Sequence, residues 1–326
     1  MSVGFWSFLR NRAVQGFILA LLVSVILVVV LGSPGLPFNR PAIRTAAPIA
    51  NVVTQLMQFV FALFVIAVAF NVTRRRAPVD FVLRTPEKEI AKQEMVWLAV
   101  YGALVLVLGS LNGIGLHLHG AIFGPVREIA PRDVFIWASY NFMFFAVIPY
   151  AIFRKRGYDH RAMCLTSDNV RNDLILIVVV LVVESIGELV AFPGIFSLSK
   201  RQVLIGVPLT IVVELLGTGI PVMVFAYALL FPRFVKVTGS AQSAIVYGAL
   251  TYAGLHVFEY WTVYDSLRHA TLSVIFVFLQ FGGPGLVKSY LTWKTGNAWV
   301  HLWAYHAIAP HVTVDTPHLI KVFRIH

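Results

Sequence analysis

Long apolar runs, separated by short polar stretches, dominate the chain. A helix that crosses a bilayer needs roughly 20 mostly apolar residues. The pattern predicts about nine such helices and therefore an all-α, polytopic transmembrane helix bundle. The predicted spans cover residues 15–31, 49–72, 94–116, 133–153, 173–192, 203–231, 241–261, 271–292 and 297–312.

Three of these runs carry further signals. The first follows Arg10 and Arg12, but its apolar stretch exceeds the 7–15 residues of a signal peptide and no small-x-small cleavage site follows, so we expect a retained anchor. The sixth is long, and Pro221 predicts a bend at residues 219–221. In the eighth, the sequence Gly282-Gly283-Pro284-Gly285 predicts an interruption.

Composition agrees with the membrane class. Hydrophobic residues make up 58% of the chain and charged residues 13%, whereas a soluble domain carries about 25% charged residues. The net charge of +11 arises from Lys and Arg in short loops, without the basic groove and interleaved aromatics that single-stranded nucleic acid needs. We therefore expect a lipid bilayer as partner and no nucleic acid.

The basic residues also predict orientation. They are concentrated in two loops, after the second and fourth predicted spans: Arg74, Arg75, Arg76, Arg84, Lys88 and Lys92, then Arg154, Lys155, Arg156, Arg161 and Arg171. Cytoplasmic loops retain positive charge. We expect a multi-pass protein of a prokaryotic cytoplasmic membrane, with the N-terminus in the cytoplasm.

Acidic side chains within apolar runs are the first candidates for chemistry, because a charge at bilayer depth is costly and usually functional. Glu184 and Glu188 are four residues apart and so share one helix face. They indicate either a proton or ion relay or a pair bonded within the bundle. Glu214 is surrounded by apolar residues, and a desolvated carboxylate suits a general base.

Histidines on later spans complete a candidate site. His256 and His306 lie in apolar surroundings, and with Glu214 they predict a catalytic group of one carboxylate and two imidazoles around a water. The same three residues form a zinc-ligand set, although no HExxH pairing is present. The sequence leaves the metal question open. Supporting candidates are Tyr252, Glu259, His311, Glu184 and Glu188, while His117-Leu118-His119 is expected to be a solvated loop pair.

Three segments then form a recognisable pattern: Glu214-Leu215-Leu216-Gly217-Thr218-Gly219, Tyr252-Ala253-Gly254-Leu255-His256, and residues 285–306 with Thr295-Gly296-Asn297 before His306. The pattern resembles the CPBP family, intramembrane proteases related to the type II CAAX prenyl proteases, whose motifs are EExxxR with Gly, FxxxH and HxxxN. The resemblance covers roughly residues 150–312. It implies a protease-like hydrolase acting on membrane-anchored peptides or proteins, and it divides the chain into N-terminal helices (1–149), a CPBP-like core (150–312) and a short tail (313–326).

The chain departs from the family pattern at three positions. Val213 stands where the family has its first Glu, Thr218 where it has Arg, and Pro310 where it has Asn or Asp. Either Glu214, Glu259 or Glu184 supplies the missing carboxylate, or the scaffold has lost its chemistry. Three hypotheses remain: a divergent endopeptidase, metalloprotease-like if a metal such as zinc is bound; an inactive scaffold or binding protein; and an ion-coupled transporter.

Overall fold

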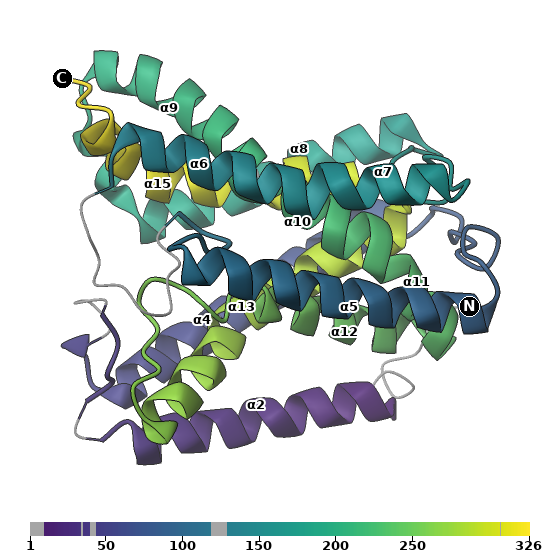
Figure 1. Cartoon of the computed structure of the whole chain (residues 1–326), viewed down its shortest axis with the longest axis horizontal. Coiled ribbons are helices and arrows are strands. Elements are labelled where there is room, and N and C mark those ends of the chain that lie inside the picture. Colours follow the sequence, from purple (N-terminus) through teal and green to yellow (C-terminus); the bar gives the residue numbers. More distant parts are fainter. Residues whose placement is uncertain (1–9, 34, 40–43, 119–128, 307) are drawn as a thin grey trace. The chain divides into compact units, whose positions relative to one another are not determined.

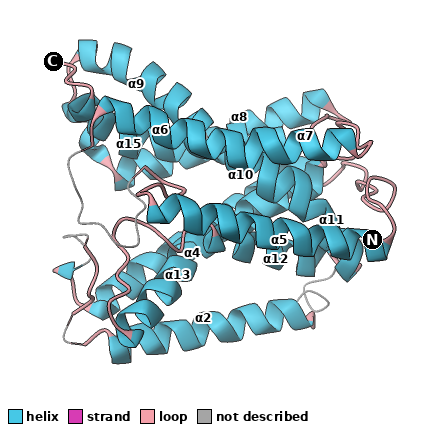
Figure 2. Ribbon diagram, viewed as in Figure 1, coloured by secondary structure: helices cyan, strands magenta, loops and turns pink. Residues whose placement is uncertain are grey.

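A computed structural model describes residues 10–33, 35–39, 44–118, 129–306 and 308–326 (Figures 1 and 2). The protein is 76% helical, and the described residues include no strand. The expected all-α class is therefore confirmed.

The helices range from single turns to long rods. The α-helices are α2 (Arg12–Leu31), α4 (Pro48–Thr73), α5 (Lys88–Leu111), α6 (Pro131–Asn141), α7 (Ile148–Lys155), α8 (Val170–Ala191), α9 (Lys200–Glu214), α10 (Ile220–Val222), α11 (Phe231–Thr238), α12 (Ala241–Gly254), α13 (Leu267–Thr295), α14 (Ala298–His301) and α15 (Ala309–Val322). Wider or tighter turns form η1 (Phe142–Val147), η2 (Pro193–Ser197), η3 (Leu215–Gly219), η4 (Met223–Leu230) and η5 (Leu302–His306).

Seven helices of the described chain are long and apolar enough to cross a membrane. They are residues 12–31, 48–73, 88–111, 131–155, 170–191, 200–238 and 267–295. On α2 the exposed side chains Leu19, Leu22, Ile26 and Val30 form an apolar stripe, while charged residues such as Glu94 and Arg233 are buried. This reversal of the soluble pattern is what a lipid-facing surface requires.

Two of the nine predicted spans have a different form. Residues 241–261 contain α12, which has only 14 residues and ends at Gly254. Residues 297–312 contain α14, η5 and the start of α15. The count of nine therefore stays a prediction, with seven long helices described.

The interruption expected at residues 282–285 is wrong, because α13 runs unbroken through Pro284. Its glycines allow close packing instead. A Cβ on Gly285 would lie 2.7 Å from the Cα of Ala249, and one on Gly282 would lie 2.9 Å from the ring of Phe59. At the expected bend near Pro221, two π-helical stretches, η3 and η4, flank the single turn α10.

The chain forms two compact units, each assembled from three segments. Unit 1 comprises residues 1–64, 81–124 and 230–290, and unit 2 comprises residues 65–80, 125–229 and 291–326. These units do not follow the segments 1–149, 150–312 and 313–326 expected from the family resemblance, and that division stays a prediction.

In unit 1, α11 packs against both α5 and α12, and α12 packs against α2. The side chains of Arg233 and Glu94 form a fully buried ion pair 2.8 Å apart. Asn11 caps the start of α2 and also bonds to Ser240 and Ser243 at the start of α12. These contacts fix the N-terminal ends of two helices at the same level.

In unit 2, α15 packs against α8 and α9, and α6 packs against η3. Gly217 allows α6 and η3 to approach closely, since a Cβ there would lie 2.0 Å from the indole of Trp137. Arg76 bonds to Asp173, whose other oxygen accepts from Asn297 at 3.0 Å. The C-terminal end of α4 and the N-terminal end of α8 therefore lie together.

We expect Gly285→Ala to destabilise the protein by about 1–3 kcal/mol, because the new methyl group overlaps the backbone of Ala249. Thermal unfolding of the detergent-solubilised protein measures this loss. Gly16→Ala is the control, since a Cβ there meets nothing within 4 Å. Equal stability of the two variants would contradict the packing of α12 on α13.

Candidate functional site

The first candidate site lies where α12 ends early. Ser240 caps the start of α12, accepting from the backbone N–H of Ser243, and the helix ends at Gly254. Two residues later, the imidazole of His256 stacks on the ring of Phe281 at 3.8 Å between centroids. Phe281 is the middle residue of the 29-residue helix α13. The end of α12 therefore lies beside the midpoint of a helix long enough to span a bilayer.

Three potential ligands converge beyond this helix end. The ligand atoms of His117, His256 and Glu259 all lie within 4.8 Å of one another. His256 and Glu259 are fully buried, and His117 is half-buried. Glu259 Oε1 lies 2.9 Å from His117 Nδ1, yet this buried oxygen has no hydrogen bond to any described residue. An imidazole nitrogen and a carboxylate oxygen at this separation form an ion pair when the imidazole is protonated, or serve as two ligands of one cation.

The backbone sets the tautomer of His256. Its Nδ1 lies 2.7 Å from the carbonyl oxygen of Tyr252. Because a carbonyl oxygen only accepts, Nδ1 must donate, and in the neutral ring Nε2 then carries the lone pair. A histidine that ligates a metal is held in this way, with its other N–H bonded to a carbonyl or carboxylate.

An aromatic wall surrounds His256. The ring of Tyr252 meets the imidazole edge-on at 4.5 Å between centroids. The ammonium group of the buried Lys288 lies 3.5 Å from the Tyr252 ring centroid, close enough for a cation–π interaction. The rings of Phe281 and Tyr252 therefore hold the imidazole in place.

The segment that carries Glu259 is held by hydrogen bonds of its own. Thr262 Oγ1 donates to the carbonyl of Glu259 at 2.6 Å. Ser273 Oγ bonds to both the N–H and the carbonyl of Val263, each at 2.9 Å. The hydroxyl of Tyr264 donates to the carbonyl of Val257. Burial raises the pKa of Tyr264 to about 12, a bond from Thr262 lowers it in part, and the charge of Glu259 raises it.

A second cluster lies in unit 2. Glu214, His311 and Asp315 place their ligand atoms within 4.8 Å of one another. His311 Nδ1 is 2.6 Å from Asp315 Oδ2 and 3.3 Å from Glu214 Oε2. The hydroxyl of Thr218 donates to Glu214 at 3.1 Å, and Glu188 interacts electrostatically with His311 and Asp315.

The residues expected in one catalytic group thus divide between two clusters. Glu214 belongs to unit 2 with His311, and His256 belongs to unit 1 with Tyr252 and Glu259. The side chain of His306 lies outside the described residues. A pocket shared by Glu214, His256 and His306 therefore stays a prediction.

His117 is the residue that sequence reasoning undervalued. It was expected to be a solvated loop residue, but its ring contacts both Glu259 and His256. The alternate spacing of His117 and His119 was the available signal, and His119 lies outside the described residues. Glu184 is buried on α8, one turn before Glu188.

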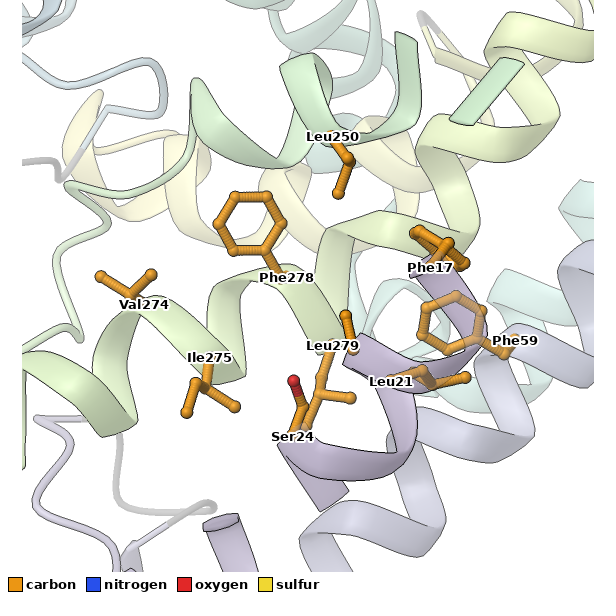
Figure 3. Close-up of a pocket in the computed structure, with 10 residues that line it drawn as sticks. Phe17, Leu21, Ser24, Phe59, Leu250, Val274, Ile275, Phe278 and Leu279 are labelled. Atoms are coloured by element: carbon orange, nitrogen blue, oxygen red, sulfur yellow. The ribbon is translucent and has the colours of Figure 1, made fainter. Parts of the chain in front are cut away.

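Unit 1 also holds an apolar pocket of about 240 Å³ (Figure 3). It is bounded by helices α2, α4, α12 and α13. Its lining residues are Phe17, Ala20, Leu21, Ser24, Phe59, Leu250, Val274, Ile275, Phe278 and Leu279. No titratable side chain lines it, so this pocket offers apolar contact and no acid–base chemistry.

Comparison with known proteins identifies no family for this chain. The chain matches no family model, no curated protein and no solved structure.

We expect Tyr264→Phe to lower stability at pH 8 by about 1 kcal/mol, the worth of one hydrogen bond. The folded pKa of about 12 exceeds the ordinary tyrosine value of 10.0, so Tyr264 contributes stability that is lost as pH rises from 10 towards 12. The stability gap between parent and variant should then narrow above pH 10. Thermal unfolding from pH 8 to 11 measures it, with the exposed Tyr247→Phe as control; a gap that stays constant with pH would contradict the burial of Tyr264.

Proposed function

We propose that the protein is a membrane-embedded hydrolase whose reaction takes place at His117, His256 and Glu259. The observation that carries this proposal is the convergence of their ligand atoms within 4.8 Å of one another. Two imidazoles and one carboxylate match the protein ligands of catalytic zinc sites, which keep a fourth position for water. The buried Glu259 oxygen without a hydrogen bond supports this assignment.

Each side chain has a distinct part. His256 presents its Nε2 lone pair because Nδ1 donates to Tyr252, and His117 Nδ1 lies 2.9 Å from Glu259 Oε1. Glu259 is the one carboxylate of the cluster, with the role of balancing a cation and accepting a proton from water. A bound divalent ion would lower the pKa of that water to about 7 and polarise a substrate carbonyl.

The position of the cluster suggests the substrate. The cluster lies beside the midpoint of α13, which is long and apolar enough to cross a membrane. Non-helical backbone at that depth is tolerated only where it is buried or lines a water-filled cavity. We therefore propose a membrane-anchored peptide or protein as substrate, cleaved within or at the edge of a prokaryotic cytoplasmic membrane, with the N-terminus in the cytoplasm.

The resemblance to the CPBP family supports a peptidase over other hydrolases. His256 ends the segment that resembles FxxxH. Glu259, three residues later, offers the carboxylate that is absent at Val213. We propose that the protein is a divergent peptidase of this kind, with the carboxylate supplied from a different place.

Glu259→Gln should reduce hydrolysis of a membrane-anchored peptide by about 100-fold or more, because the amide neither balances a cation nor accepts a proton. His256→Ala should do the same. His269→Ala is the matched control, since this half-buried histidine pairs with the exposed Asp265 on the same unit. Turnover is measured with purified protein in liposomes, and folding is checked by thermal unfolding.

Three outcomes would point elsewhere. Parental activity in Glu259→Gln together with loss in Glu214→Gln would favour the catalytic group expected from the sequence. A parent without turnover that forms a stable complex in a pull-down would indicate a scaffold or binding protein. Proton-coupled uptake abolished by Glu188→Gln would indicate a transporter.

Removal of divalent metal should abolish hydrolysis, and zinc should restore it to the parent protein but not to His256→Ala. The reason is that three side chains must share the ion. Activity assays before and after dialysis against a chelator test this, with bound zinc determined by elemental analysis. Full activity in metal-free protein would contradict a metal-dependent reaction.

A further inference from the structure

The second cluster joins α9 and α15 of unit 2, interacts electrostatically with Glu188 of α8, and is independent of the proposed hydrolytic site. Glu214 ends α9, Glu188 lies near the end of α8, and His311 and Asp315 lie one turn apart on α15. The ligand atoms of Glu214, His311 and Asp315 lie within 4.8 Å of one another.

Close packing of α9 and α15 places these side chains together. A Cβ on Gly206 would lie 2.7 Å from the side chain of Ile320 and 3.1 Å from that of Thr316. Gly206, Thr210 and Glu214 are all buried at four-residue intervals, on one face of α9. The two helices run antiparallel, so Glu214 meets the start of α15 at His311. The cluster is therefore set by the register of two helices.

Carboxyl groups outnumber the imidazole at the cluster. Glu214 and Asp315 lie against His311, and Glu188 interacts electrostatically with His311 and Asp315. Glu188 Oε2 is buried and has no hydrogen bond to a described residue. Carboxyl groups this close together require either a cation or shared protons.

We propose that Glu214, His311 and Asp315 bind a divalent transition-metal ion, with Glu188 acting on the site electrostatically. Carboxylate oxygens favour Mg²⁺ and Mn²⁺, while an imidazole nitrogen favours Zn²⁺, Fe²⁺ and related ions, so the mixed set favours a transition metal over Mg²⁺ or Ca²⁺. The 3.3 Å between His311 Nδ1 and Glu214 Oε2 is the separation that two ligands of one ion need when each bond is about 2.1 Å. His311 Nδ1 and Asp315 Oδ2 are 2.6 Å apart in a hydrogen bond, which an ion bound by both residues would replace. Such an ion would hold α9 and α15 together.

Mn²⁺ is the probe, and the experiment uses the full-length His256→Ala protein so that the hydrolytic site cannot bind it. After treatment with a chelator, this protein should bind one Mn²⁺, measured by the loss of the free-ion signal in electron paramagnetic resonance. Adding Asp315→Asn or Glu188→Gln should weaken binding at least tenfold. Mn²⁺ should also raise the Tm of the His256→Ala protein but not that of the double variants.

The control is Asp265→Asn in the same background. The exposed Asp265 pairs with His269 at the same four-residue spacing as His311 and Asp315, so this change should leave Mn²⁺ binding unaltered. Absence of Mn²⁺ binding in the His256→Ala protein, or unchanged affinity in both double variants, overturns the proposal and indicates that the carboxylates share protons. Neither result bears on hydrolysis at Glu259, which is read from turnover.

Discussion

The structure of unit 1 depends on one constraint: each backbone N–H and C=O in an apolar environment needs a partner. A helix meets that need internally, and α12 stops meeting it at Gly254, beside the middle of α13. Turn bonds from the N–H groups of Leu255 and His256 to Thr251 and Ala253 satisfy the exposed end. Further along the segment, three side chains bond to backbone groups. Thr262 donates to the carbonyl of Glu259, Ser273 accepts from the N–H of Val263, and Tyr264 donates to the carbonyl of Val257. The same segment carries His256 and Glu259, so the polar groups that permit a helix to end here also create a polar site.

Buried charge is used in two ways. Arg233–Glu94 and Arg76–Asp173 are closed pairs in which each ion meets its opposite. Removing one partner of such a pair would leave an uncompensated buried charge, which is strongly destabilising. The two clusters differ, because carboxylates and imidazoles gather there in unequal numbers. The closed ion pairs stabilise the fold. In the two unequal clusters, a bound cation or a transferred proton would stabilise the buried charge.

Apolar run length was sufficient to predict the all-α class and most long helices, because spanning a bilayer imposes a length that single-sequence reasoning recognises. The same reasoning extended α12 beyond its end at Gly254 and predicted an interruption at residues 282–285 that α13 does not have. Both errors have the same cause. A glycine-rich stretch signals either a break or a close contact, and only the partner helix decides which. In α13 the partner is Ala249, so the helix continues. Burial of Glu214, His256 and Glu259 followed from their apolar neighbours, but their pairing did not. His117 reaches Glu259 through a loop whose path no periodicity encodes.

The segments of the two units alternate along the sequence, and this order has a consequence for biosynthesis. Unit 1 needs residues up to 290, and unit 2 needs the C-terminal segment from 291 onwards. A ribosome therefore delivers most of the apolar helices before either unit has its full set of segments. After His117 is synthesised, more than a hundred further residues must be added before His256 and Glu259 complete the first cluster. The second cluster is complete only when α15 has followed Glu214. A chain terminated before residue 256 would lack two of the three residues of the first cluster, and one terminated before α15 would lack His311 and Asp315 of the second.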